Sequence, residues 1–430
     1  MTIKFTKYFL VVMVFIVIPY FIDQINGFVN LVLNRDLPIS KAYKTPMLLF
    51  AIIYTFLFDK TRRYSIMLII LLLLMSASTV VNIYDQYPQF DDLASDLGYM
   101  LKIFSFPVLY FFFAVFHTRN PFPEEQFVRK IFLFLFGAFG VAILLSYMGF
   151  GIPFYGTTRE GESIGQQGYF ISGNEISGMY LLYASVFYYY VFKSESIINM
   201  FLGLAVGIGV GMLMGSKTAI GSSIICFFGI YFLLKMYRRK IGVINKVDAS
   251  ILVTFTGIMF LGVIFISQIS EIIQPVIRHF TYRYNVSGDV VRFLTSGRLE
   301  RAEGVLNNFI NNYSFGHMLF GEGYTMSKTL QIANWRYSNS EMDIIDIMCI
   351  AGIFGVTIIY SFWTYIFLKI YQVFRNRSHE LAVPLTIAFA ILIINSVLSG
   401  HIIYSGVVTP NLAYLSVFIL KQSHHSRNEG

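Results

Sequence analysis

Five arginines occur between residues 278 and 301, within a polar stretch of an otherwise apolar chain. They are Arg278, Arg283, Arg292, Arg298 and Arg301. Guanidinium groups stay charged at every working pH, and their planar fork can bind two phosphate oxygens at once. Arg298 and Arg301 are three residues apart, so on a helix they would share one face. The arginines therefore indicate either a phosphate-binding site or a solvated face that also touches lipid headgroups.

A further cation stands in the tight turn Gly215-Ser216-Lys217-Thr218, between two short apolar segments. The spacing is not that of a Walker P-loop, and no strand is expected before it. A lysine at the end of a membrane helix can simply extend its ammonium group to the interface. The functional alternative is a cation held at membrane depth against a lipid-linked diphosphate.

Three carboxylates open a later apolar segment: Glu341, Asp343 and Asp346. Acidic side chains are favoured near a helix N-terminus by the helix dipole, which is sufficient to explain Glu341 and Asp343. Asp346 lies one turn deeper. An acid inside a membrane span usually faces a cavity, a partner charge or a functional path, so Asp346 is a candidate for substrate binding.

The polar stretch from residue 155 to 175 holds two more candidates, Arg159 and Asn174. Nearby amides and aromatic rings, such as Gln166 and Tyr169, suit sugar binding, and they suit an ordinary polar loop equally well.

Histidines and cysteines give no sign of a metal centre. His279, His317 and His401 are isolated, and a structural role is expected for each. Cys226 and Cys349 both fall inside apolar segments, where a buried thiol is expected and a disulfide is not. No metal or other cofactor is therefore expected.

The elements that position these residues are expected to be membrane helices. The chain has 430 residues, of which 56% are hydrophobic and 13% charged. Soluble proteins carry about 25% charged residues. Apolar runs of about 17–25 residues recur along the chain, and in lipid such runs must be helices rather than open strands. We expect an all-α, polytopic integral membrane protein, in which the net charge of +8 reflects membrane orientation rather than nucleic-acid binding.

Hydropathy predicts about twelve transmembrane helices. Their approximate limits are 8–30, 45–58, 65–83, 99–116, 130–150, 175–192, 198–214, 218–234, 249–268, 342–368, 381–400 and 404–421. The first apolar run is too long for a signal peptide and lacks a small-residue cleavage site, so we interpret it as a retained helix.

The distribution of Lys and Arg predicts the orientation of the chain. Alternate short loops are rich in both, which places both termini in the cytoplasm. Three regions follow: 1–268 with nine helices, 269–341 as a long periplasmic or extracellular loop, and 342–430 with three helices and a cytoplasmic tail. Within the loop, apolar residues recur every three or four positions after Ser296-Gly297, which predicts an amphipathic helix that begins there.

Several short motifs follow one another in a distinctive order. They are Gly173-Asn174-Glu175, the Gly-Ser-Lys-Thr turn at 215–218, Ser296-Gly297-Arg298, a Gly-x-Gly at Gly321 and Gly323, and a Gly-x-x-Gly at Gly352 and Gly355. The series, over roughly residues 170–360, resembles the O-antigen polymerase and O-antigen ligase superfamily of bacterial membrane glycosyltransferases.

The resemblance implies an inner-membrane enzyme that needs neither a metal nor a nucleotide sugar. Its donor would be a glycan on undecaprenyl diphosphate, transferred to another lipid-linked repeat unit. Partners would be that lipid-linked oligosaccharide, membrane lipid and a chain-length regulator protein, and not nucleic acid. The diphosphate would be held by Lys217 and Arg298, with Arg292 and Arg301 as neighbours.

Two departures from the family pattern matter. Lys217 stands where the family often has arginine, and lysine binds phosphate only as a point charge. Ligases carry a histidine where this chain has Glu341, eleven positions before Gly352, which favours a polymerase over a ligase. The catalytic candidates are accordingly Arg298, Lys217 and Glu341. The substrate-binding candidates are Arg292, Arg301, Arg278, Arg283, Arg159, Asn174 and Asp346.

Two alternative functions remain at this stage. One is a ligase that moves finished glycan to another acceptor. The other is a transporter or flippase of lipid-linked glycan. Transporters, however, are often built from two related halves. The predicted long loop follows the ninth helix and has no counterpart in the first half, which argues against a symmetric carrier.

Overall fold

The computed structural model describes residues 2–86, 90–120, 124–154, 165–238, 284–328 and 340–428, with a few further positions between 274 and 282. In this part of the chain the elements are helices, and the only β pairing is an isolated bridge between Pro153 and Gln166. The all-α prediction is therefore confirmed for the described residues.

The first helix is continuous through one π-helical turn. It comprises α1 (Thr2–Val12), η1 (Met13–Val17) and α2 (Ile18–Leu31). The helices of the first half that follow are α3 (Ile39–Phe58), α4 (Arg63–Gln86), α5 (Phe90–Ile103), α6 (Ser105–Arg119), α7 (Glu125–Tyr147), α8 (Gly173–Lys193), α9 (Ile197–Met214) and α10 (Lys217–Tyr237). The later helices are α13 (Val290–Thr295), α14 (Arg298–Asn312), α15 (Phe315–Phe320), α17 (Asp343–Arg375), α18 (Ala382–Leu398) and α19 (Val408–Asn428).

Six of the described helices are long and apolar enough to cross a bilayer, and one bent pair would make a seventh. The six are Lys7–Leu31, Arg63–Val81, Glu125–Tyr147, Ile197–Met214, Lys217–Tyr237 and Asp343–Arg375. The pair joins Leu93–Ile103 to Ser105–Arg119 at an angle of 58°. Helices α3, α8, α18 and α19 lie at further predicted spans. The ninth predicted span, 249–268, lies outside the described residues, and the count of about twelve stays a prediction.

The outside of the bundle is apolar, as a lipid-facing surface requires. Leu57 on α3 is 70% exposed, and Leu73 on α4 is 62% exposed. Exposing so many apolar side chains to water would cost free energy, whereas contact with lipid tails would not. The chain is therefore a helical membrane protein.

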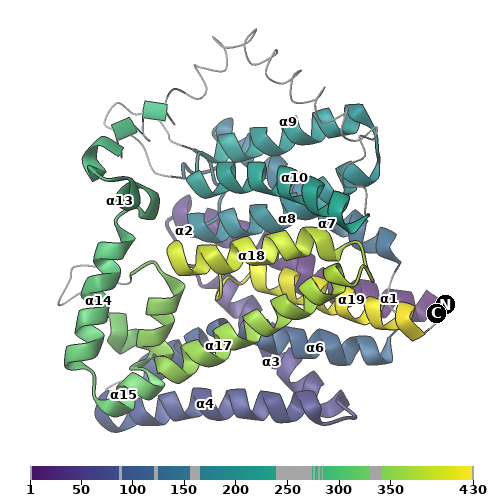
Figure 1. Cartoon of the computed structure of the whole chain (residues 1–430). Coiled ribbons are helices and arrows are strands. Elements are labelled where there is room, and N and C mark those ends of the chain that lie inside the picture. The colour runs from purple at the N-terminus through teal and green to yellow at the C-terminus, as the bar shows by residue number, and fades with distance from the viewer. Residues whose placement is uncertain are drawn as a thin grey trace.

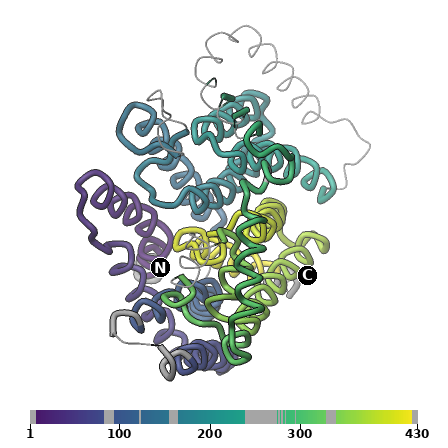
Figure 2. Tube along the Cα trace, turned by 90° about the vertical axis from the view of Figure 1, so that its left-hand side faces the viewer, coloured from purple at the N-terminus to yellow at the C-terminus, as the bar shows by residue number. Residues whose placement is uncertain are grey.

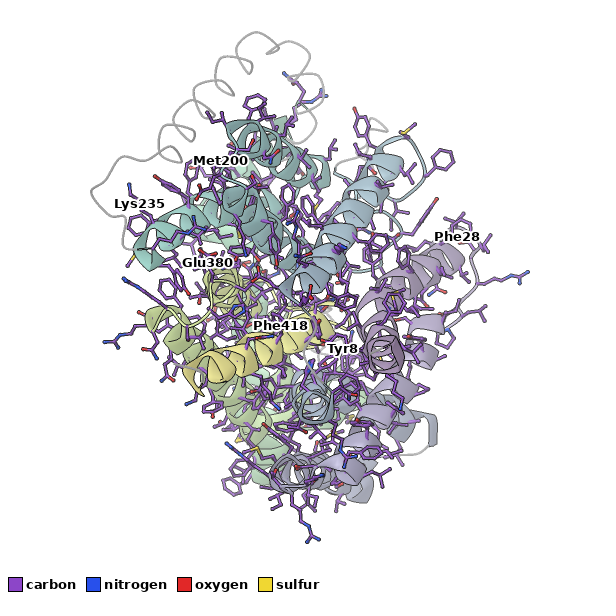
Figure 3. All side chains as sticks on the ribbon, turned by 90° about the vertical axis from the view of Figure 1, so that its right-hand side faces the viewer. Tyr8, Phe28, Met200, Lys235, Glu380 and Phe418 are labelled. Carbon is purple, nitrogen blue, oxygen red and sulfur yellow. The ribbon has the colours of Figure 1, made fainter. Side chains whose placement is uncertain are left out.

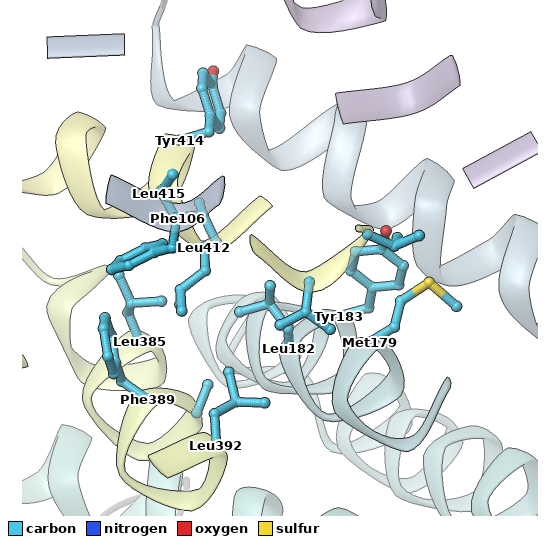
Figure 4. Close-up of a cluster of buried hydrophobic side chains, with 14 of the residues drawn as sticks. Phe106, Met179, Leu182, Tyr183, Leu385, Phe389, Leu392, Leu412, Tyr414 and Leu415 are labelled. Atoms are coloured by element: carbon cyan, nitrogen blue, oxygen red, sulfur yellow. The ribbon is translucent and has the colours of Figure 1, made fainter. Parts of the chain in front are cut away.

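Helices α8 and α19 form the centre of the bundle, because they are buried on nearly all sides. Figure 4 shows where they meet α6 and α18, with Tyr183 and Leu412 among the buried side chains and Phe106 and Phe389 beside them. Aromatic rings pack edge to face here: the ring centroids of Phe106 and Phe389 are 5.9 Å apart. This packed centre fixes the start of α8, which carries Asn174.

The two ends of the bundle differ. Helices α13, α14 and α15 lie at one end, and both termini lie at the other (Figure 1). Figure 2 views the molecule from the first end, with the green helices running across the ends of the others. Figure 3 shows the terminal end, where Lys235 and Glu380 are labelled. An ion pair joins Arg238 to Glu380 there, with an Nε–Oε1 distance of 2.7 Å. Among the described candidates, Asn174, Arg298, Arg301 and Glu341 meet at the end that carries α13–α15.

Candidate functional site

Helix α14 begins at Arg298, directly after a tight turn that ends α13. Ser296 and Gly297 both have positive φ, at 55° and 73°. A Cβ on Gly297 would meet no atom within 4 Å, so glycine is favoured by the backbone conformation rather than by lack of space. The helix that the Ser-Gly motif predicts is thus present, and its inner face, including Val305 and Phe309, is buried.

Arg298 and Arg301 reach the same carboxylate, as the three-residue spacing predicts. The Nε of Arg298 lies 3.1 Å from Oε2 of Glu341, and Nη1 of Arg301 lies 2.7 Å from Oε1. Burial alone would raise the pKa of Glu341, but the two guanidinium charges outweigh burial and hold the pKa below its usual value. Glu341 is therefore ionised at neutral pH.

Asn174 completes this cluster from the start of α8. Its Oδ1 accepts a hydrogen bond of 3.4 Å from Nη2 of Arg298, and its amide donates to the carbonyl of Ser399 at 2.8 Å. We call Asn174, Arg298, Arg301 and Glu341 the arginine–glutamate site. Its side chains come from three separate segments, and two guanidinium charges against one carboxylate leave one positive charge in excess.

Two buried acids that follow Glu341 in the sequence, Asp343 and Asp346, fix the backbone around it. Oδ1 of Asp346 accepts hydrogen bonds from the backbone N–H and the hydroxyl of Ser340, at 2.8 and 2.7 Å. Asp343 accepts hydrogen bonds from three successive backbone N–H groups, at residues 401–403. Both side chains are buried. The described contacts of Asp346 fix the backbone next to Glu341, and its role in substrate binding stays a prediction.

Lys217 contacts the turn before α14. Its ammonium group donates to the carbonyl of Phe293 and, at 3.3 Å, to Oγ of Ser296. It also lies 4.0 Å from the centroid of the Phe293 ring, a cation–π distance. The Ser216 hydroxyl caps α10 by accepting from the N–H of Ala219 at 2.9 Å. Lys217 thus joins the α9–α10 turn to the residues that lead into Arg298.

Of the other arginine candidates, the two that the structure describes lie at the surface. Arg292 forms an ion pair with Glu300, with 3.0 Å between Nε and Oε1, and its side chain is 50% exposed. Arg278 is exposed. Arg283 and Arg159 lie outside the described residues.

The two glycine motifs pack against each other. Helix α17 is broken at Gly352, where φ is 69° and ψ is −177°. The break frees a carbonyl, and Cys349 O accepts a hydrogen bond of 2.9 Å from the N–H of Glu322. A Cβ on Gly321 would lie 2.2 Å from the carbonyl oxygen of Ile350, and one on Gly352 would lie 2.2 Å from that of Leu319. Neither position accommodates a side chain, so these glycines fix the segment after α15 on α17.

His401, for which the sequence predicts a structural role, lies among charged groups that include residues of the site. Burial lowers the pKa of His401, and the charges of Glu175, Lys102, Glu341 and Arg298 all act on it. Its Nδ1 lies 3.1 Å from the Tyr404 hydroxyl. A neutral imidazole between these charged groups could accept a proton at pH 7. An isolated histidine in the sequence gives no signal of this position, because the neighbours come from distant segments.

Among the described residues, no group of His, Cys, Asp and Glu has the geometry to hold a metal ion. No protein-family model and no curated protein matches this chain. The arginine–glutamate site places two guanidinium groups, held by one carboxylate and one amide, at one end of a bundle of membrane helices.

Proposed function

We propose that this protein is a membrane glycosyltransferase that polymerises the repeat units of a bacterial surface polysaccharide. The observation that carries the proposal is the convergence of Arg298 and Arg301 on Glu341, with Asn174 bound to Arg298, at the end of a membrane bundle. Cations fixed beside a bilayer suit a substrate whose phosphate groups sit at the membrane surface. Undecaprenyl diphosphate carrying an oligosaccharide is such a substrate.

The predicted topology is part of the proposal. About twelve spans would cross the inner membrane, both termini would be cytoplasmic, and the segment 269–341 would form the outer loop. The arginine–glutamate site would then face the compartment in which repeat units are joined. A chain-length regulator protein would be the expected partner, and no cofactor would be needed.

In the proposed reaction, a hydroxyl oxygen of one lipid-linked unit attacks the anomeric carbon of the glycan on the other. The bond between that carbon and the diphosphate oxygen breaks, and undecaprenyl diphosphate leaves with the electron pair. Negative charge grows on the diphosphate during this step. Arg298 and Arg301 would stabilise it, since donors fixed in advance need no reorganisation as the charge develops.

The proton of the attacking hydroxyl needs an acceptor, and two side chains are candidates. Glu341 is a weak base while both arginines hold it. A diphosphate that binds Arg298 and Arg301 would compete for their N–H groups and loosen that hold, so the carboxylate would become a better base when the donor is present. His401 is the second candidate, because its lowered pKa keeps it neutral.

Glu341 also bears on the choice between polymerase and ligase. The family resemblance places a histidine at this position in ligases, so the glutamate favours polymerisation over transfer to another kind of acceptor. A flippase would need no base and no site for a leaving diphosphate.

Purified protein in lipid nanodiscs, supplied with an undecaprenyl-diphosphate-linked repeat unit, tests the proposal. We expect a ladder of longer lipid-linked chains and stoichiometric release of undecaprenyl diphosphate. Movement of the intact lipid-linked unit across the bilayer without a new glycosidic bond would instead show a flippase. Transfer only to a different acceptor would show a ligase.

A further inference from the structure

A second polar cluster lies beside the start of α8, at Glu175. It borders a cavity of about 400 Å³ between α2, α3, α5 and α8 and the residues that begin α19. Ligand pockets of proteins commonly have volumes of about 300–1,000 Å³. The size is therefore that of a binding site rather than of a packing defect.

The charged residues that line this cavity are Lys41, Lys44, Lys102, Asp23 and Glu175. The Nζ of Lys44 lies 2.6 Å from both oxygens of Asp23. The Nζ of Lys102 lies 3.3 Å from Oε1 of Glu175. Three ammonium groups against two carboxylates leave one positive charge in excess. Charges gathered in a cavity of a membrane bundle are costly, so they point to an anionic ligand.

The cavity becomes apolar along the helices, away from these charges. Met47 and Leu48 follow Lys44 by about one turn of α3, and Met179 follows Glu175 by one turn of α8. All three apolar side chains line the cavity. A free sugar or a free phosphate would leave this apolar wall unmatched. An amphiphile with an anionic head and an apolar tail would match both parts.

The cavity and the arginine–glutamate site share one short segment of backbone. Asn174 and Glu175 are consecutive residues at the start of α8. Asn174 accepts a hydrogen bond from Arg298, whereas Glu175 pairs with Lys102. Two anionic groups bound at these places would both lie next to one helix start, so their attached groups would be close together.

We infer that the cavity holds the phosphate-bearing head and the first apolar units of a second lipid, and that this lipid is the polyprenyl diphosphate of the second repeat unit. The inference rests on the proposed function, because joining two lipid-linked units requires two such lipids to be bound at once. An anionic phospholipid of the bilayer has the same head chemistry, and the experiment separates the two sources.

Native mass spectrometry of the full-length protein, released from nanodiscs, counts bound lipids with undecaprenyl diphosphate as the probe. We expect two per wild-type protein. The double variant Lys41→Gln/Lys102→Gln turns the excess charge of the cavity from positive to negative and should bind one, with second-site affinity weakened at least about 10-fold. The double variant Arg298→Ala/Arg301→Ala should also bind one. Lys130→Gln/Lys193→Gln, at the terminal end, is the matched control and should bind two.

Folding is checked with Lys41→Glu alone, because Lys41 is exposed and its replacement opens no cavity. This variant should have the melting temperature of wild type and a lower affinity for the second lipid. Two bound lipids in the Lys41→Gln/Lys102→Gln variant would overturn the inference. So would displacement of the second undecaprenyl diphosphate by an equal concentration of phosphatidylglycerol. If two lipids bind specifically but the protein makes no polymer in the nanodisc assay, the cavity site is supported and the proposed function is contradicted.

Discussion

Arg301 and Glu341 lie 40 residues apart in the chain, yet Nη1 of the arginine and Oε1 of the glutamate are 2.7 Å apart. Arg298, one turn earlier on α14, holds the other oxygen of the same carboxylate. The carboxylate thus fixes the spacing of two guanidinium groups. The same contact that orients the arginines lowers the pKa of Glu341 and so weakens it as a base.

Glu341→Gln should slow glycan transfer without weakening donor binding. The amide keeps the shape of the side chain but cannot accept the hydroxyl proton, and it no longer competes with phosphate for the arginines. We expect kcat to fall about 10²-fold or more, with KM for the donor unchanged or lower. Steady-state kinetics with a lipid-linked repeat unit measure both. A normal kcat in Glu341→Gln, together with a lost pH dependence in His401→Gln, would assign the base to His401.

Lys217→Met should impair the enzyme through the turn before α14. The ammonium group holds the Phe293 carbonyl and the Ser296 hydroxyl, so its loss should free the segment that positions Arg298. We expect a lower melting temperature together with reduced turnover. Lys217→Arg should keep both, because a guanidinium can donate to the same oxygens and lie over the Phe293 ring. Unchanged melting of Lys217→Met with a selective loss of donor affinity would show direct contact with diphosphate instead.

Glu322 should make stability depend on pH. Burial raises the pKa of Glu322 from 4.5 to about 7, with the Tyr313 phenol acting weakly in the opposite direction. Between these two values the folded protein keeps a proton that the unfolded chain has released, so stability falls as pH rises through that range. Glu322→Gln removes this effect and should raise the melting temperature at pH 8 more than at pH 5. Equal shifts at the two pH values would contradict the assignment.

Both ends of the bundle can be assigned to a compartment by cysteine labelling. Asn311 is exposed on α14, and Lys60 is exposed in the α3–α4 connection near the termini. We expect Asn311→Cys to react with an impermeant reagent in cells with a permeabilised outer membrane. Lys60→Cys should react only after the inner membrane is broken. The native thiols, Cys226 and Cys349, are buried and give little background. The reverse pattern would place the arginine–glutamate site in the cytoplasm.

Local features were predictable from the sequence, and long-range contacts were not. The start of α14 at Arg298 and the common face of Arg298 and Arg301 follow from turn chemistry and helical periodicity, which depend on neighbouring residues. Their partner, Glu341, comes close because α14 packs against α17, and no local sequence pattern predicts that packing. The contact of Lys217 with the Phe293 carbonyl also joins segments that meet only in the folded bundle. The same holds for the lysines that line the cavity.

The most direct test of the central claim compares two arginines of the same segment. Turnover of an undecaprenyl-diphosphate-linked repeat unit is measured for wild type, Arg298→Ala and Arg292→Ala, all at matched expression and melting temperature. Arg298→Ala should lower kcat about 10²–10³-fold, as expected for a lost donor to a growing negative charge. Arg292, which pairs with Glu300 at the surface, should be replaceable with turnover near wild type. Normal turnover in Arg298→Ala, or equal damage in both variants, would contradict the account.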